Sequence, residues 1–138
     1  MENYYEDKYA TVYHALDIKA VLVEWKSFKT IPIEDYKQIF NKAQELLKAQ
    51  KPENFIADNR LQGIINPEQR KWLEEVSLPE SAKIGMKRIA VISDMNVFKR
   101  YYLNKLLASV NKFKIPFKIF KETDLAIEWI KKLEKTIK

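Results

Sequence analysis

Three consecutive polar side chains follow an apolar run in the first half of the chain and could form a binding site. They are Asp58, Asn59 and Arg60, within the segment FIADNRLQGIINPEQRKWL at residues 55–73. In an open α/β sheet, ligands bind outside the carboxyl ends of parallel strands, where these residues would lie. The alternative is structural: Asp58 and Asn59 would satisfy loop N–H groups, and Arg60 would pair with Asp58 or Glu68. The sequence leaves both interpretations open.

The residues just after this cluster have the pattern of a helix N-terminus. Asn66 is a favoured N-cap, Pro67 suits the first helical position, and Gln69 completes an Asn-x-x-Gln capping box. We therefore predict a structural role for these three residues, with partner recognition as the alternative.

The sequence offers few groups for catalysis. It has no cysteine and one histidine, His14, which excludes thiolate chemistry and a Cys/His pair. Asp58, Ser93 and Lys121 stand where a phospho-receiver domain has its aspartate, hydroxyl and lysine. The acidic pair that would hold Mg²⁺ is missing, because only Glu24 lies near that position. We expect no enzymatic activity, no cofactor and no metal site.

The elements that position these residues follow from the hydrophobic pattern. Strands are predicted at residues 9–16, 19–26, 54–58, 87–93 and 116–120, and helices begin after residues 30–32 and at residues 67, 95 and 123. The first two strands can pair as a hairpin. Strands alternating with long helices indicate an α/β fold with a mostly parallel sheet covered by helices. If the third and fourth strands are neighbours, Ser93 lies near Asp58 and joins the candidate binding residues.

The predicted order, β-β-α-β-α-β-α-β-α, and several segments resemble the STAS domain (sulfate transporter and anti-sigma factor antagonist). The resemblance is closest to the bacterial, stand-alone sporulation antagonist-like branch, whose fold is also likened to the lipid-binding Sec14 domain. The segments that carry it are VLVEWKSF, FIADNRLQGIINPEQRKWL, KRIAVIS and DLAIEWIKKL. The resemblance implies one STAS-like domain over residues 1–138 with a non-catalytic regulatory or protein-interaction role. Residues 1–8 are expected to form a flexible tail.

One position departs from the family pattern. The antagonists of this family carry an aspartate at the end of the third strand and a second aspartate before a phosphorylated serine or threonine. Asp58 matches the first aspartate, whereas the second falls on Asn66 and the phosphoacceptor on Pro67 or Glu68. Neither of these side chains can accept a phosphate, so we predict that the kinase-controlled switch is absent.

The charge is distributed unevenly along the chain. The net charge is +6, yet residues 1–82 carry 11 basic and 14 acidic side chains, whereas residues 83–138 carry 14 and 5. A basic half can attract nucleic acid, anionic lipid or an acidic protein. The lysines are evenly spread and no nucleic-acid reading motif is present, so we expect solvated helix faces and no nucleic-acid partner. With no long apolar run and no signal-peptide pattern, we expect no membrane span and a cytoplasmic location.

Two binding hypotheses follow. One is an interaction domain that docks a protein partner through residues 59–72 and the long helix. The other is a Sec14-like carrier of a small apolar ligand, in a cavity lined by aromatic side chains. The aromatic candidates are Trp25, Trp72, Phe98, Tyr101 and Tyr102. The segment FKRYYLNKLL has more apolar residues than one helix face buries, so we also expect a homodimer.

Overall fold

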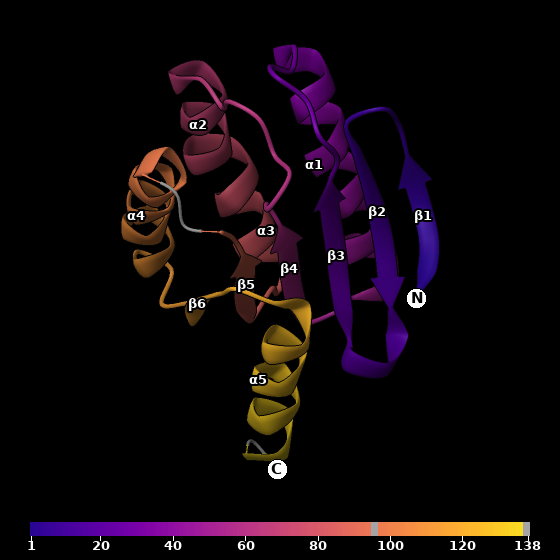
Figure 1. Ribbon diagram of the computed structural model, residues 1–138. Helices are drawn as coiled ribbons and strands as arrows, with labels where there is room; N and C mark the ends of the chain where they lie inside the picture. The colour runs from indigo at the N-terminus through magenta and orange to yellow at the C-terminus, as the bar shows by residue number, and fades with distance from the viewer. Residues whose placement is uncertain (95–96, 137–138) are drawn as a thin grey trace.

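The computed structural model describes residues 1–94 and 97–136, without the side chains of residues 97–99, 102 and 134–136. Within these residues the strands form a six-stranded sheet in the order β1-β2-β3-β4-β5-β6 (Figure 1). The strands are β1 (Glu2–Glu6), β2 (Ala10–Ala15), β3 (Ala20–Trp25), β4 (Asn54–Asp58), β5 (Arg88–Ile92) and β6 (Phe117–Phe120). The helices are α1 (Ile33–Gln50), α2 (Pro67–Trp72), α3 (Leu78–Ile84), α4 (Val97–Asn111) and α5 (Thr123–Thr136), with a 3-10 turn η1 (Leu16–Ile18) and a π-helical turn η2 (Leu73–Ser77).

The sheet is mixed, as the sequence predicts. The strands β1, β2 and β3 pair antiparallel, and β3 to β6 pair parallel. The predicted hairpin is confirmed, with Ala10 opposite Trp25 and Ala15 opposite Ala20. The α/β class and the mostly parallel sheet are therefore confirmed. The long helix predicted from residue 95 is α4, and residues 95–96 lie outside the described residues.

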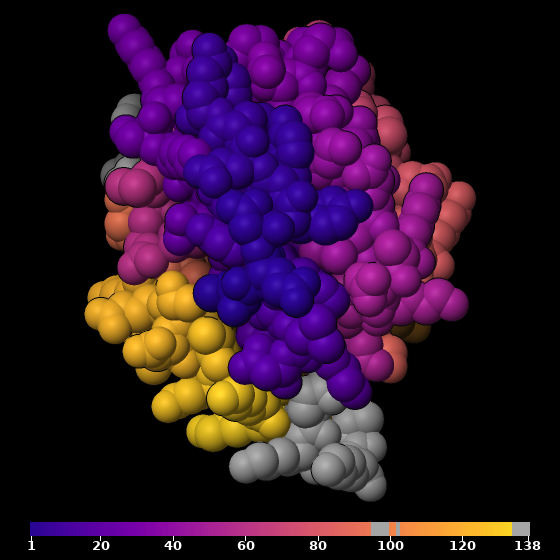
Figure 2. Space-filling model, turned by 90° about the vertical axis from the view of Figure 1, so that its right-hand side faces the viewer, coloured from indigo at the N-terminus to yellow at the C-terminus, as the bar shows by residue number. Residues whose placement is uncertain are grey.

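The expected flexible tail at residues 1–8 is wrong, because these residues contain β1. This strand extends the hairpin and forms one edge of the sheet, which faces the viewer in Figure 2. Lys26 Nζ lies 2.6 Å from Glu6 Oε2 and donates to the carbonyl of Asp7 at 2.8 Å. The hydrogen bond from Lys26 lowers the pKa of Glu6 below its ordinary value. The sequence pattern did not predict this strand, because its side chains are charged, polar or aromatic and mostly exposed.

The helices cover the two faces of the sheet unequally. The helices α1, α3 and α4 pack on one face, with the larger core between them and the sheet. Three connections, β3–α1–β4, β4–α2–α3–β5 and β5–α4–β6, each join neighbouring parallel strands and proceed in the same direction across the sheet. Connections of this kind have the same handedness, so their helices lie on the same face. The helix α5 packs on the opposite face over a smaller core (Figure 1).

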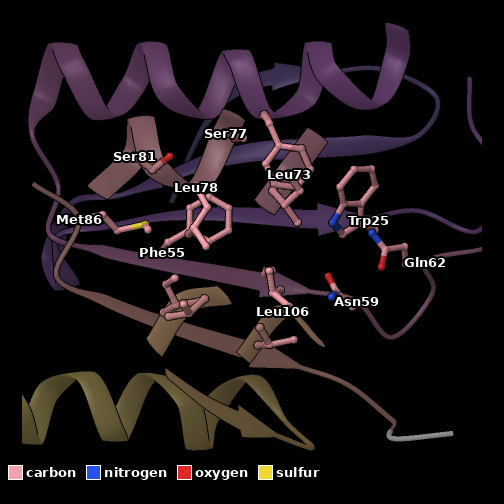
Figure 3. Close-up of a pocket in the computed structure, with 15 residues that line it drawn as sticks. Trp25, Phe55, Asn59, Gln62, Leu73, Ser77, Leu78, Ser81, Met86 and Leu106 are labelled. Atoms are coloured by element: carbon pink, nitrogen blue, oxygen red, sulfur yellow. The ribbon is translucent and has the colours of Figure 1, made fainter. Parts of the chain in front are cut away.

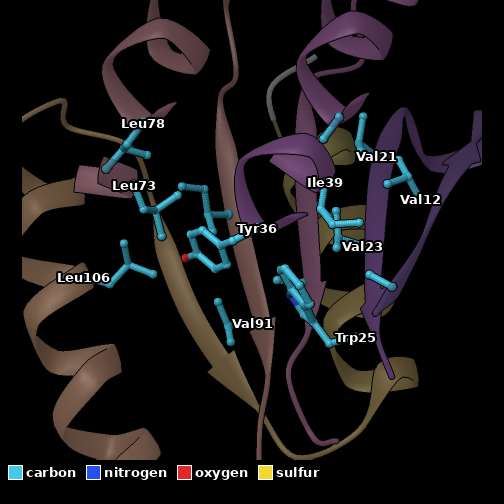
Figure 4. Close-up of a cluster of buried hydrophobic side chains, with 14 of the residues drawn as sticks. Val12, Val21, Val23, Trp25, Tyr36, Ile39, Leu73, Leu78, Val91 and Leu106 are labelled. Carbon is cyan, nitrogen blue, oxygen red and sulfur yellow. The ribbon is translucent and has the colours of Figure 1, made fainter. Parts of the chain in front are cut away.

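Strand alternation divides the apolar side chains of β3 between the two cores. Val21, Val23 and Trp25 belong to the larger core, and Ala20 and Leu22 to the smaller one. In the larger core Trp25 lies near Tyr36 of α1 (Figure 4), with ring centroids 5.8 Å apart and an interplanar angle of 19°. Trp25 is the last residue of β3, so this part of the larger core lies next to the polar cluster at the end of the neighbouring strand β4.

Candidate functional site

Asp58 and Arg60 form an ion pair at the carboxyl end of β4. Arg60 donates from Nε to Asp58 Oδ1 at 3.0 Å and from Nη2 to Oδ2 at 2.7 Å, and its backbone N–H donates to Oδ1 at 3.2 Å. The Asp58 side chain is buried, whereas that of Arg60 is 42% exposed. Hydrogen bonding to Asp58 raises the pKa of Arg60 above its ordinary value, against the opposing effect of burial. The ion-pair interpretation of Arg60 is confirmed.

The capping box at the start of α2 is also confirmed. Asn66 Oδ1 accepts the backbone N–H of Gln69 at 2.9 Å, and Gln69 Oε1 accepts that of Asn66 at 3.0 Å. The buried Gln69 amide also donates to the carbonyl of Ile31. Together these bonds attach the start of α2 to the segment before α1.

The loop of residues 59–66 is held against the segment that follows β3. Ile64 donates its N–H to the carbonyl of Lys29 at 3.0 Å and forms a bridge with Thr30. A Cβ at Gly63 would lie 1.9 Å from the carbonyl oxygen of Phe28, so only glycine fits this approach. The loop directs two apolar side chains to solvent, since Leu61 is 62% and Ile64 is 63% exposed.

The structure brings Asn59 and Ser93 to the same sheet edge as Asp58. Asn59 donates its N–H to the carbonyl of Ile92 at 2.8 Å, across the β4–β5 pair. Ser93 is fully buried and donates its N–H to the carbonyl of Phe120 at 2.9 Å. The predicted proximity of Ser93 to this cluster follows from the confirmed pairing of β4 with β5.

A cavity of about 60 Å³ lies between the sheet and the helices of the larger core (Figure 3). A single water needs about 10–15 Å³ on this measure, so the space suits a few waters or a small organic group. Its wall is formed by side chains of β3, β4, β5, α1, α3, α4, η2, the loop of residues 59–66 and the turn between α3 and β5. They are Trp25, Phe40, Phe55, Ala57, Asn59, Gln62, Leu73, Ser77, Leu78, Ser81, Met86, Ile89, Val91, Leu106 and Val110.

The polar side chains of the cavity wall differ in whether they have hydrogen-bond partners. Gln44 Nε2 lies within 3.4 Å of the hydroxyls of Ser77 and Ser81 and donates to the Ser77 carbonyl at 3.0 Å. Asn59 is only 5% exposed, and its Oδ1 is buried without a hydrogen-bond partner. Figure 3 shows Asn59 beside Gln62 at the Trp25 end of the cavity. Buried polar atoms are nearly always paired, with protein groups or with ordered water, so this oxygen is open to a hydrogen-bond donor from outside the chain.

The π-helical turn η2, which forms part of the cavity wall, can be explained by the proline that follows it. Pro79 follows one residue after the start of α3 and has no N–H to offer the carbonyl of Glu75, four residues before it. Helices accommodate such a break by local widening, and η2 is a π-helical turn of this kind. Leu73 and Ser77, at its two ends, both face the cavity.

Two of the aromatic residues predicted to line a cavity, Trp72 and Tyr101, are not among the residues that line this one. Trp72 is half-buried and packs on Tyr36 and Phe40, with ring centroids 6.1 and 6.0 Å away, outside the cavity wall. Tyr101 is 58% exposed, with the Arg70 guanidinium 5.8 Å from its ring centroid. The wall includes Trp25, as predicted. The side chains of Phe98 and Tyr102 lie outside the described residues.

Sequence reasoning named Asn59 but missed Gln62, Ser77 and Ser81. No periodic signal marks these three, because they meet only when η2, α3 and the loop pack on the sheet. Among the described residues no cluster of carboxylates and imidazoles has metal-binding geometry. Within the same residues, no helix combines the length and apolar character needed to cross a membrane.

The chain was compared with models of protein families, with curated proteins and with solved structures, and none of the three gave a significant match.

Proposed function

We propose that this chain is a non-catalytic binding domain of the STAS and Sec14 type, and that it binds a small, mostly apolar molecule in the cavity of the larger core. The observation that carries the proposal is the buried, unpaired Oδ1 of Asn59 in the wall of a mostly apolar cavity. Binding sites for small molecules combine an apolar lining with a few convergent polar groups, and this wall has that composition.

The order of the elements supports the STAS-like part of the proposal. From β2 onward the chain follows the β-β-α-β-α-β-α-β-α order that the resemblance implies, with η2 and α3 continuing α2. The departure at the phosphoacceptor position fits a domain without a kinase switch. Asn66 is engaged in the capping box, and Pro67 is the first residue of α2. In this proposal, occupancy of the cavity replaces phosphorylation as the controlling event.

A protein-interaction role is the second candidate, and the loop of residues 59–66 favours it. The loop is pinned at Gly63 and Ile64, and it presents Leu61 and Ile64 as exposed apolar side chains. A rigid apolar protrusion suits a protein partner, because little conformational entropy is lost on docking. We propose that such a partner, or a second copy of the chain, contacts this loop. Native mass spectrometry of the purified protein would distinguish a monomer from a dimer.

Benzene tests the main proposal, because it needs only apolar space. We expect benzene to bind the wild-type chain and to shift the methyl NMR signals of Leu73, Val91 and Leu106, all of which line the cavity. The variant Ala57→Leu places a larger side chain in the same wall, and its binding of benzene should fall below detection.

The matched control is Ala108→Leu, at an exposed position of α4, which should bind benzene like the wild type. If benzene shifted the same signals equally in Ala57→Leu and in the wild type, or shifted none, the proposed binding site would be wrong.

A further inference from the structure

The cavity wall carries information about the chemistry of its ligand. We infer that the ligand is a small, uncharged molecule with an apolar body and a hydrogen-bond donor, such as a hydroxyl or an amide N–H, that donates to Asn59 Oδ1. This inference rests on the proposed function, since it names the class of molecule that the same cavity holds.

The position of Asn59 is fixed by its backbone. Its N–H donates to the carbonyl of Ile92 at 2.8 Å, and its own carbonyl accepts the N–H of Gln62 at 3.2 Å. The residue is therefore anchored to β5 on one side and to the loop on the other. Its side chain is directed toward the cavity, where its oxygen has no partner (Figure 3). An acceptor held in this way is preorganised for a donor that arrives with the ligand.

The unpaired oxygen specifies a donor. A carboxamide oxygen only accepts hydrogen bonds, so an ether, ketone or halogen placed against it would leave it unpaired. A hydroxyl or an N–H would satisfy it, and the free energy of the unpaired group would be recovered on binding. Glu74 Oε1 is the other buried, unpaired side-chain atom among the described residues, and Glu74 is not part of the cavity wall.

The rest of the wall specifies an uncharged ligand. None of the lining residues that the structure describes has an ionised side chain. A charged ligand would lose its hydration without gaining a counter-ion, which is costly in a buried site. At the opposite end the serine hydroxyls of Ser77 and Ser81 already lie against Gln44. Between the two ends the wall is apolar and suits an alkyl or aromatic body.

Phenol and fluorobenzene test the inference, because they are nearly the same size and only phenol has a donor. We expect phenol to bind the wild-type chain about tenfold more tightly, the effect of one added hydrogen bond in a buried site. Dissociation constants would come from NMR titration, following the cavity methyl signals and the side-chain amide signal of Asn59. The amide signal should move with phenol and much less with fluorobenzene.

Asn59→Leu removes the acceptor while keeping a similar volume, and it should bind both probes with equal affinity. Asn104→Leu, the same substitution at an exposed position of α4, should keep the wild-type preference for phenol. If Asn59→Leu does not fold, the comparison of phenol with fluorobenzene in the wild-type chain still tests the inference.

The failures of the two proposals are distinguishable. Binding of neither probe would overturn the proposed function and the inference together. Equal binding of both probes by the wild type would leave the cavity as an apolar site and overturn the inference, since Asn59 would then give no selectivity. A preference for phenol that persists in Asn59→Leu would also overturn it, because another group would be the acceptor.

Discussion

Asp58 places a carboxylate in a buried position, and Arg60 makes this possible. Two side-chain N–H groups and one backbone N–H of Arg60 are directed at the two carboxylate oxygens. Paired, hydrogen-bonded charges are tolerated inside a protein, whereas a charge that loses its partner is not. Because β4 ends at Asp58 and the loop that carries Asn59 and Gln62 follows it, this ion pair also fixes where the loop leaves the sheet.

We predict that Arg60→Ala lowers the free energy of unfolding by about 1–3 kcal/mol, because it leaves the buried Asp58 carboxylate without its main donors. Arg100→Ala removes an exposed guanidinium from α4, and it should stay within about 0.5 kcal/mol of the wild type. Denaturant unfolding at neutral pH measures both.

Adding Asp58→Asn to Arg60→Ala should restore part of the loss, since the unpaired charge is then removed. A cost for Arg60→Ala as small as that of Arg100→Ala would show that the ion pair contributes little to folding.

At this scale the sequence predicted interactions that are local in the chain. The capping box of Asn66 and Gln69 and the pairing of Arg60 with Asp58 lie within three residues, so residue type and spacing were sufficient. The burial of Asn59 and the meeting of Gln44 with Ser77 and Ser81 depend on contacts 33 or more residues apart. No local pattern specifies such contacts, which explains why most of the cavity wall was missed.

At the scale of elements, two glycines are required for different reasons. A Cβ at Gly63 would meet three backbone atoms, of Phe28 and Lys29, at 1.9 to 2.8 Å. Gly85 ends α3 with φ at +114°, and a Cβ there would meet nothing within 4 Å. Gly63 is therefore needed for close packing of the loop, and Gly85 for its left-handed backbone.

We predict that Gly63→Ala forces the loop of residues 59–66 away from residues 28–30, because neither backbone segment can rotate out of the contact. Amide NMR signals of residues 28–30 and 59–66 should shift together, and the free energy of unfolding should fall by about 1–3 kcal/mol. Benzene binding should weaken as well, since Asn59 and Gln62 of this loop form part of the cavity wall.

Gly85→Ala is the matched control. It should cost a similar free energy, about 1–3 kcal/mol, through backbone strain alone. Its signal changes should stay near the end of α3, and its benzene binding should be unchanged. Identical patterns of signal change in the two variants would contradict the assigned role of Gly63.

The order of the elements was predictable because periodicity is a local property. The buried face of α1 repeats at three and four residues, through Tyr36, Ile39, Ala43 and Leu46, as predicted. The strand β5 is buried on both faces, and after Arg88 its residues 89–92 form a continuous apolar run. The strand β1 was missed because its side chains are mostly exposed and it is held by backbone pairing and by Lys26. The π-helical turn was missed because the sequence predicts one helix from residue 67, and no periodic pattern marks a local widening within it.

At the scale of the whole molecule, the sheet has two edges, and β1 protects one of them. It carries Glu2 and Glu6 and has an irregular register between Asn3 and Tyr5, features that discourage pairing with another chain. Behind it lies β2, whose residues Ala10–Ala15 include no carboxylate, lysine or arginine and are mostly buried. An exposed strand of this type is a site of edge-to-edge association.

We therefore predict that a chain beginning at Asp7 associates with itself, because the backbone groups and apolar side chains of β2 become accessible. Asp7 is kept because its carboxylate accepts the N–H groups of Tyr9 and Ala10, at 2.8 and 3.0 Å, and so fixes the turn before β2. Light scattering after size exclusion should show a mass that rises with concentration, beyond any association of the full chain.

Glu6→Gln in the full chain provides the control. It removes the ion pair with Lys26 and leaves β1 in place, so its mass should match that of the unaltered chain at every concentration. Circular dichroism would show whether the shortened chain keeps its fold. If it does, and its association state matches that of the full chain at every concentration, then β1 is not what shields β2. The mixed charge of the first half of the molecule would then be the remaining explanation for the lack of association. Adding salt, which screens such charges over about 10 Å at 0.1 M, should in that case make the shortened chain associate.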